Sequence, residues 1–306
     1  MIEPLQTWLA EQVGRPVAIV TLRRIATGHS RAMWFVELDD GQRLVVRVEQ
    51  GGVFGTSTVD EFELMRAAAE LGVPVAPVRW LEPTGRVLGQ PFFAMDFVES
   101  ASAQREDRTL PDDVATDFIR RLHELHSVDR QGRVQPADAG TNATDTQIDR
   151  WAGIYRAASP VALPLLDEAA AWLHRHAPEL AQPAIVHGDP GPGNFLHDGT
   201  AVVAFTDWEF AHIGDPMEDW VYLISMRGAR TMTADRWRQL ITDTVGVDVT
   251  DWDLRYWGAF NFFKGACANL TCLQVFGGPN PAPNMAIIGT ALQQTFMRNL
   301  AQLVAG

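Results

Sequence analysis

The chain has 306 residues, and its 46% hydrophobic and 21% charged residues are typical of a folded globular protein rather than a disordered one. The formal net charge of −13 argues against a nucleic-acid binder and a polybasic membrane-surface protein, because both meet phosphate groups with positive charge. No apolar run approaches the roughly 18 residues of a membrane span, and the first residues lack the basic start and apolar core of a signal peptide. We therefore expect a cytoplasmic protein with neither nucleic-acid nor membrane partners.

The first hundred residues predict a mainly antiparallel sheet. Residues 1–12 and 58–71 repeat hydrophobic residues at helical spacing. A tight hairpin turn is expected at Asp39-Asp40-Gly41, between two runs of alternating hydrophobic residues. Strands are expected at residues 16–25, 32–38, 44–48, 78–81 and 92–98.

From about Glu99 the pattern becomes mostly helical. A short strand (AIVHGD) and a hairpin (NFLHDGTAVVAFTDWE) interrupt the helices. Helices are expected at residues 112–126, around Trp151, at 165–176 and over most of 217–303, with a surface loop at 131–146. This is an α+β, bilobal plan, with an N-terminal lobe at residues 1–98 and a C-terminal catalytic and substrate-binding lobe at 99–306. Such a plan suits a nucleotide held between the lobes.

Three polar residues carry the strongest functional signal. Asp189 follows the strand AIVHG, Asn194 comes five positions later, and Asp207 ends the apolar strand AVVAFT. Phosphoryl transfer needs a carboxylate to accept or orient a hydroxyl proton, and oxygen ligands for magnesium. The spacing from Asp189 to Asn194 is that of a kinase catalytic loop, and Asp207 stands where kinases have a metal-binding Asp.

The strings HGDPGPGNFL and FTDWEFAHIGDPMEDW resemble the aminoglycoside phosphotransferase and choline kinase superfamily, a branch of the protein-kinase-like fold. The longer string resembles more closely the phosphotransferase domains associated with acyl-CoA dehydrogenases. The resemblance extends upstream through LVVRV, VDEFELMRAAAELGVPVAPV, GQPFFAMDFVES and RLHELHSVD, so it covers most of the chain up to about Arg227. It implies an ATP- and Mg2+-dependent phosphotransferase that acts on a hydroxyl of a small-molecule substrate.

By this resemblance Asp189 would be the catalytic base, and Asn194 and Asp207 would bind magnesium. Arg47 stands where most kinases have a phosphate-binding Lys, and Glu61 on the following helix would be its ion-pair partner. An Arg keeps the positive charge and can hold phosphate oxygens with two nitrogens. The resemblance also assigns a loop over the phosphates to Gly28 and Ser30, and a hinge against the adenine to Met95, Asp96, Phe97 and Val98.

Each of these residues alone has an ordinary structural interpretation. An Asp in a Gly-Pro-rich loop usually belongs to a turn, and Arg47 alone would be an exposed strand residue. The ordered set is what favours catalysis. We interpret His187 as a support of the catalytic loop, and His123 and His126 as core or boundary residues. The acidic run of Glu209, Asp215, Glu218 and Asp219 is expected to hold loops and cap the next helix, and Trp220, Trp252 and Trp257 to lie in the core or the cleft wall.

Two other functions are compatible with parts of the sequence. A metallohydrolase could use His187 and Asp189 with His197 and His212 as zinc ligands, but this hypothesis leaves the first hundred residues unexplained. A catalytically weak or silent nucleotide-binding module is suggested by Arg47. The presence of all three residues Asp189, Asn194 and Asp207 argues against this alternative.

The acceptor is addressed only by the C-terminal aromatic residues. They could form an apolar wall for a hydrophobic alcohol or acyl-type substrate, or could simply be core: Trp252, Tyr256, Trp257, Phe260, Phe262 and Phe263. The two cysteines, Cys267 and Cys272, lie in the same apolar stretch and are expected to be buried thiols.

Overall fold

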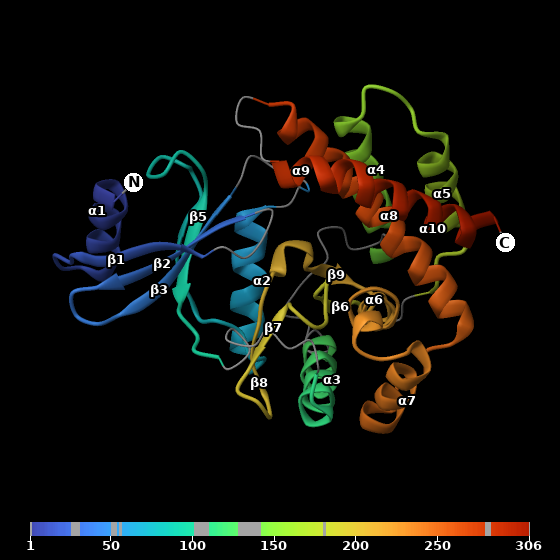
Figure 1. The fold of residues 1–306 in the computed structure, drawn as a ribbon, viewed down its shortest axis with the longest axis horizontal. Coiled ribbons are helices and arrows are strands. Elements are labelled where there is room, and N and C mark those ends of the chain that lie inside the picture. The colour runs from blue at the N-terminus through green and yellow to red at the C-terminus, as the bar shows by residue number, and fades with distance from the viewer. Residues whose placement is uncertain are drawn as a thin grey trace.

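Alternating hydrophobic side chains build a five-stranded antiparallel sheet at the N-terminus, coloured blue to teal in Figure 1. The computed structural model describes residues 2–25, 31–49, 54, 57–100, 110–127, 142–179, 182–278 and 283–305. The strands are β1 (Ile19–Ile25), β2 (Arg31–Leu38), β3 (Arg43–Glu49), β4 (Val78–Glu82) and β5 (Phe92–Asp96), in the order β1-β2-β3-β5-β4. All neighbouring pairs are antiparallel, as predicted.

The two faces of the sheet pack against different partners. Helix α1 (Ile2–Val13) buries Trp8 against Phe92, with the ring centroids 4.7 Å apart, and closes one face. Helix α2 (Thr58–Glu70) lies against the other face, where Phe62 packs on Phe93 at 5.8 Å. Because side chains alternate along a strand, Arg47 of β3 points to the α2 side, toward the second lobe.

The second lobe is mostly helical (Figure 1). Its helices are α3 (Asp112–His126), α4 (Ala143–Ala158), α5 (Pro164–Arg175), α6 (Met217–Tyr222), α7 (Ala234–Val245), α8 (Asp251–Phe276), α9 (Pro283–Ile287) and α10 (Gln293–Ala305). Shorter helical turns are η4 (Trp208–Phe210), η5 (Leu223–Arg227), η6 (Gly228–Arg230) and η7 (Ile288–Leu292), of which η5 and η7 are π-helical. The chain therefore has the predicted α+β, bilobal, protein-kinase-like fold.

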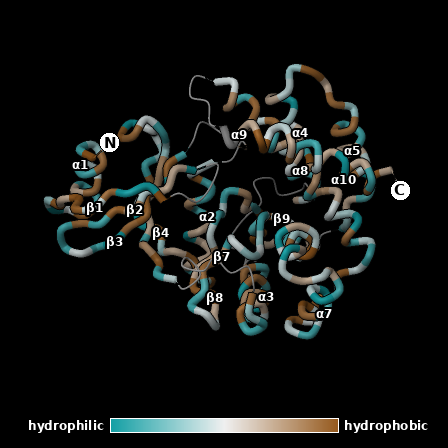
Figure 2. The backbone as a smooth tube through the Cα atoms, in the orientation of Figure 1, coloured by the Kyte–Doolittle hydropathy of each residue, from teal (hydrophilic) through white to brown (hydrophobic). Residues whose placement is uncertain are grey.

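Helix α8 organises this lobe because it is buried on most of its circumference, as expected of a helix with apolar residues all round. It packs on α4, α5, α6 and α10, and a capping box formed by Thr250 and Asp253 begins it. The outer helices α3 and α7 carry both hydrophobic and hydrophilic residues (Figure 2). No helix in the described part of the chain is long and apolar enough to cross a membrane.

Two expectations for this lobe need correction. Residues 143–146 are not loop but the first turn of α4, because the Asn142 side chain accepts a hydrogen bond from the Thr144 N–H and caps the helix there. Trp252 is not in the core, since 46% of it is exposed at the start of α8. Of the two interpretations left open for the C-terminal aromatic residues, the structure favours core for most of them: Tyr256, Trp257, Phe260 and Phe263 are fully buried, and Phe262 packs on Phe296.

Two predictions for buried residues are confirmed. Cys267 and Cys272 are free, buried thiols of α8. Trp220 and Trp257 are buried in the core of the lobe.

Four short strands form two separate antiparallel pairs that carry the polar motifs: β6 (Ala184–Val186) with β9 (His212–Gly214), and β7 (Phe195–His197) with β8 (Val202–Phe205). Helix α3 supports the second pair through Phe118. The Phe118 ring stacks on Phe195 at 4.6 Å and contacts Phe205 at 5.6 Å. The hairpin that bears Asn194 and Asp207 at its open end therefore rests on one fully buried ring.

We expect Phe118→Ala to lower the free energy of unfolding by about 3–5 kcal/mol, because it removes a buried ring and leaves a cavity between α3 and the hairpin. Denaturant titration followed by circular dichroism measures this loss. Phe276→Ala is the matched control, since this ring is 41% exposed and its removal should cost little. Equal losses in the two variants would contradict the assignment.

Candidate active site

A buried carboxylate holds the backbone of the His187-Gly188-Asp189 loop. Asp219 of α6 accepts hydrogen bonds from the N–H groups of His187 and Gly188, both at 2.8 Å. The His126 imidazole lies 2.8 Å from the same carboxylate. Burial alone would raise the pKa of Asp219, but the hydrogen bond and charge of His126 outweigh it and hold the pKa below its ordinary value.

A buried lysine holds the same loop from the other side. Lys264 of α8 donates from Nζ to the Gly188 carbonyl at 2.6 Å and to Glu218 Oε1 at 2.5 Å. His212 Nε2 lies 3.2 Å from the second Glu218 oxygen. No motif pointed to Lys264, because it lies 76 positions downstream of Gly188 inside an apolar helix.

No side chain fits at Gly188. Its φ is +78°, and a Cβ atom there would lie 2.4 Å from the Phe210 carbonyl oxygen. The loop therefore touches the backbone that follows Asp207. His187 strengthens the same junction, since its Nε2 lies 3.0 Å from the Thr206 carbonyl. This confirms the interpretation of His187 as a support of the loop.

Asp189 and Asn194 contact each other directly. The Asn194 amide nitrogen donates to Asp189 Oδ2 and to the Asp189 carbonyl, each at 2.8 Å. Both residues are buried. These bonds fix the orientation of the Asn194 amide, with its nitrogen toward Asp189.

Asp207 lies next to Asn194 because of the pairing of β7 and β8. Phe195 faces Phe205 in the register, and the Thr206 N–H donates to the Asn194 carbonyl at 2.9 Å. Asp207 has a left-handed backbone, with φ 66° and ψ 55°, an uncommon conformation for a residue other than glycine that is enriched at functional sites. Its side chain remains 29% exposed, so the carboxylate is accessible from the cleft.

Arg47 joins the lobes by contacting two carboxylates. Its Nε lies 2.7 Å from Glu61 Oε1, and its Nη2 donates to Asp207 Oδ1 at 3.0 Å. The predicted Arg47–Glu61 pair is therefore present, with Arg31 as a second cation 3.6 Å from Glu61. Burial raises the pKa of Glu61, and the two guanidinium groups oppose that rise. Burial also acts to raise the pKa of Asp207, but Arg47 outweighs it and lowers the value.

Arg227 is a site residue that sequence reasoning missed. Its Nε donates to Asp189 Oδ1 at 2.6 Å, and its Nη2 donates to Asp189 Oδ2. This two-pronged contact is the strongest kind of arginine–carboxylate pair. Arg227 belongs to η5, 38 positions after Asp189, where no motif marks it.

The hinge residues lie at the end of β5 and beyond. The Asp96 carboxylate accepts two hydrogen bonds from Arg79, at 2.7 and 2.6 Å, and so faces the outer strand β4. The Phe97 N–H donates to the Arg43 carbonyl at 3.1 Å. Met95 and Val98 pack partly buried against the main core. Gly28 and Ser30 lie outside the described residues.

Three residues of the acidic run, Asp215, Glu218 and Asp219, have the structural role that was predicted. Asp215 caps α6 by accepting a hydrogen bond from the Met217 N–H at 2.8 Å, while Glu218 and Asp219 hold the loop as described above. His126 is buried beside Asp219, a boundary residue as expected.

The donors present suit magnesium better than zinc. Asn194 and Asp207 offer an amide oxygen and a carboxylate at one edge, and such hard oxygen ligands fit Mg2+ bound jointly by protein and phosphates. Among the residues that the structure describes, no three His, Cys, Asp or Glu side chains converge on a point that could hold a metal. The His187, Asp189, His197 and His212 set of the hydrolase hypothesis is therefore not assembled.

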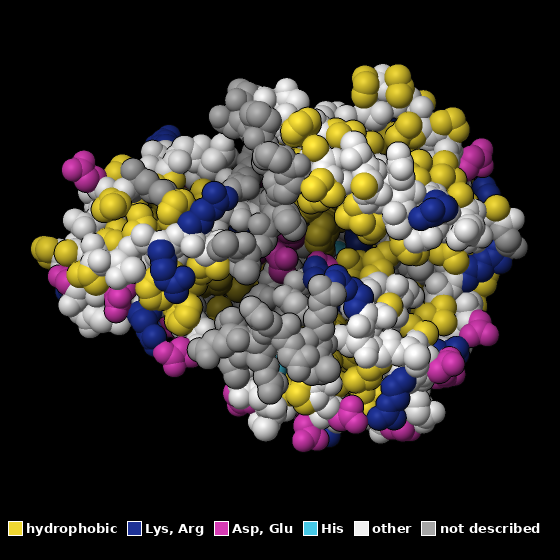
Figure 3. Space-filling view, in the orientation of Figure 1, with side chains coloured by type: hydrophobic (Ala, Val, Ile, Leu, Met, Phe, Trp, Pro, Cys, Tyr) yellow, Lys and Arg dark blue, Asp and Glu magenta, His cyan; other side chains and the backbone are white. Residues whose placement is uncertain are grey.

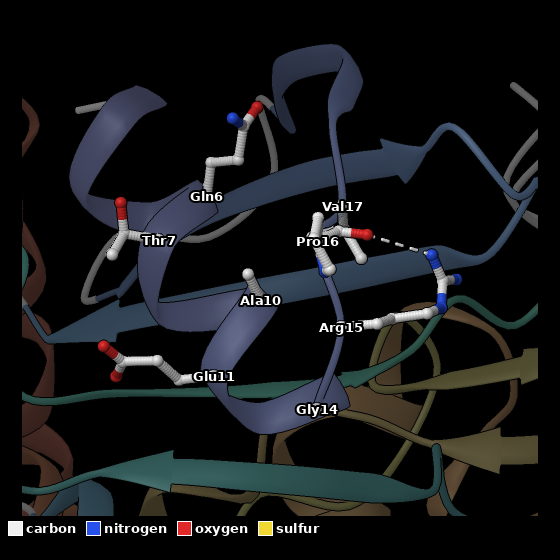
Figure 4. A pocket seen from close by; sticks show the side chains of 8 residues that line it. All are labelled: Gln6, Thr7, Ala10, Glu11, Gly14, Arg15, Pro16 and Val17. Atoms are coloured by element: carbon white, nitrogen blue, oxygen red, sulfur yellow. Dashed lines mark hydrogen bonds between the residues drawn. The ribbon is translucent and has the colours of Figure 1, made fainter.

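The space-filling view shows acidic side chains on the floor of a depression between the lobes, with basic side chains beside them (Figure 3). A second hollow, of about 570 Å3, lies between α1 and the start of β1 and is lined by residues from Gln6 to Val17 (Figure 4). It contains none of the site residues. The predicted site residues Asp189, Asn194, Asp207 and Arg47 lie instead where the two lobes meet.

We expect Asp219→Asn to cost about 3–5 kcal/mol of unfolding free energy, because an amide cannot accept from all three donors and the buried charge balance is lost. Since the folded-state pKa of Asp219 is lowered, its contribution is present above the ordinary pKa of about 3.9 and lost as the pH falls through the folded value. Urea titrations at several pH values test both statements. The exposed Asp248→Asn should change stability by less than about 0.5 kcal/mol, and a similarly small effect at Asp219 would refute its anchoring role.

Comparison with known proteins supports the motifs. The family model described as the phosphotransferase enzyme family matches residues 21–258. Acyl-CoA dehydrogenase family member 10 of Mus musculus is 29% identical over 208 residues, which are 64% of this chain and 19% of that protein. The chain thus spans about a fifth of this relative's length.

Two solved structures share the fold. A candidate aminoglycoside phosphotransferase from Ralstonia eutropha JMP134 has a TM-score of 0.69 and 22% identity, covering 99% of this chain and 98% of that chain. Aminoglycoside phosphotransferase APH(4)-Ia, solved with ADP and hygromycin B, has a TM-score of 0.67 and 14% identity over 99% of both chains. The resemblance seen in the motifs is confirmed, and the chain belongs to the phosphotransferase enzyme family.

Proposed function

We propose that this protein is a small-molecule kinase that transfers the terminal phosphoryl group of ATP, with magnesium, to a hydroxyl group. One observation carries the proposal: Asp189, Asn194 and Asp207 meet at one edge of the cleft, with Arg47 reaching Asp207 from the other lobe. A proton acceptor, two oxygen ligands and a cation for the phosphates are the parts that phosphoryl transfer requires.

The nucleotide would bind between an N-terminal lobe of residues 1–98 and a C-terminal lobe of residues 99–306. The hinge from Met95 to Val98 would meet the adenine, and Gly28 and Ser30 would lie over the phosphates. Arg47, oriented by Glu61, would hold phosphate oxygens with its planar fork. This division assigns ATP binding to the sheet and acceptor binding to the helices.

In the reaction the acceptor oxygen forms a bond to the terminal phosphorus while the bond from that phosphorus to the bridging oxygen of ADP breaks. The hydroxyl proton passes to a carboxylate oxygen of Asp189, which Asn194 orients. Asn194 and Asp207 would hold Mg2+, which when bound supplies positive charge to the phosphate oxygens. The products are ADP and a phosphate monoester, so the chemistry needs no further reactant.

The acceptor class follows from the family rather than from an apolar wall, since those aromatic residues are core. APH(4)-Ia binds hygromycin B, a small hydroxylated molecule. We therefore assign a small hydroxylated substrate. A screen of such compounds for ATP consumption would identify it.

Asp189→Asn should lower turnover by about 10²–10⁴-fold, the usual contribution of a general base, while nucleotide affinity stays nearly unchanged. The carboxylate acts on the acceptor rather than on ATP, which is the reason for this separation. ATP consumption with the acceptor found by screening, together with calorimetric titration of ATP, measures both effects. Asp198→Asn in the β7–β8 turn is the control, and full turnover of the Asp189 variant would refute the role.

Asp207→Ala should weaken ATP binding only when magnesium is present, because its carboxylate would act through the ion that bridges the phosphates. Without the ion, its loss also releases Arg47 from an ion pair, so metal-free affinity should not fall. Calorimetry with magnesium and with a chelator distinguishes the two conditions. An equal loss in both would indicate a structural role instead.

A further inference from the structure

The catalytic loop contains no cation of its own. Between Asp189 and Asn194 the chain reads Pro190-Gly191-Pro192-Gly193. A transferred phosphoryl group nevertheless carries charge on its equatorial oxygens, and kinases and GTPases commonly meet that charge with a positive side chain. The charge must therefore come from an element outside the loop.

The side chain of Arg227 lies against both glycines of this loop, and at Gly191 it leaves no room for a side chain. A Cβ atom at Gly191 would lie 2.8 Å from Arg227 Cβ, and one at Gly193 would lie 3.5 Å from Arg227 Nη1. Both glycines also have positive φ, at +135° and +100°. The loop is thus shaped around this arginine, and Nη1 lies along its Gly193 end.

Arg227 lies near both of the carboxylates that would flank the reacting phosphoryl group. Nε and Nη2 engage Asp189, and the positive charge of Arg227 also helps to lower the pKa of Asp207. Although it is paired, 31% of the side chain remains exposed. An arginine that served only to neutralise buried Asp189 would not need an accessible edge.

The backbone below Arg227 is constrained. Arg227 ends the π-helical turn η5, a rare geometry that is frequent at functional sites. At the next position a Cβ on Gly228 would lie 2.4 Å from the Leu223 carbonyl oxygen, and the Trp237 indole donates to the Gly228 carbonyl at 2.9 Å. The base of the side chain is therefore held while its tip reaches the cleft.

We propose that Arg227 is a catalytic residue that contacts the oxygens of the phosphoryl group during transfer, as an arginine supplied by the same chain. This inference rests on the proposed function. Nε and Nη2 keep Asp189 oriented toward the acceptor hydroxyl, and Nη1 donates to a phosphoryl oxygen as the bond to ADP breaks. The arginine itself gains and loses no proton. Its contact with the phosphoryl group is stronger during transfer than its contact with bound ADP, so it stabilises the transition state.

The test uses MgADP with and without aluminium fluoride, which mimics the planar phosphoryl group and requires no acceptor. Arg227→Met should bind MgADP within about twofold of wild type, but should lose about tenfold to a hundredfold of the added affinity that aluminium fluoride gives, as expected for one lost hydrogen bond to a charged group. Arg227→Lys should be intermediate. Arg230→Met, an exposed neighbour, is the matched control and should behave as wild type.

A double variant, Arg227→Met with Asp189→Asn, separates contact with the phosphoryl group from support of Asp189. It also avoids the unpaired buried carboxylate that Arg227→Met alone would leave at Asp189. If Arg227 touches the phosphoryl mimic, adding Arg227→Met to Asp189→Asn should again lower the aluminium fluoride effect by about tenfold or more. No further loss in that background would overturn the inference, as would an undiminished effect in Arg227→Met or no effect in wild type. Failure of wild type to bind MgADP at all would instead refute the proposed kinase function.

Discussion

Burying the Asp219 carboxylate beneath the His187-Gly188-Asp189 loop is the constraint on which the candidate site depends. Desolvating a carboxylate costs several kcal/mol unless hydrogen bonds and an opposite charge replace the water. Here the replacement is the backbone N–H groups of His187 and Gly188, with His126 beside them. The carboxylate is therefore satisfied only when the loop takes one conformation. Lys264 imposes the matching constraint on the Gly188 carbonyl, so both backbone polar groups of Gly188, the residue before Asp189, are held.

A second set of charges connects the lobes. Arg47 shares its guanidinium between Glu61 of its own lobe and Asp207 of the other. Burial makes each of these contacts stronger than it would be in water, and also makes any unpaired member costly. Under the proposed function, a nucleotide phosphate would replace Asp207 as a partner of Arg47, and Mg2+ would become the partner of the Asp207 carboxylate. The same residues then stabilise the structure before binding and the nucleotide afterwards.

Much of the fold could be predicted because its signals are local. The alternation in β2 and β3 and the helical period of α2 indicated those elements nearly to their ends, and the Asp189 to Asn194 spacing indicated a loop whose two side chains do contact each other. The predictions failed where burial depends on distant segments. Trp252 and Trp257 occur in one helical pattern, yet only Trp257 faces the core, because the packing of α8 decides which side is covered.

Arg227 and Lys264 show the same limit within the site. Both reach the catalytic loop from helices far downstream, and neither stands in a pattern that separates it from any other basic residue. What could be read from the sequence is the space they need: glycines at 188, 191 and 193 leave the loop without side chains where other groups approach. A glycine in such a loop is usually attributed to its turn. In this chain the close approaches of Phe210 to Gly188 and of Arg227 to Gly191 supply a further reason, because a missing side chain in one segment leaves room for a group from another.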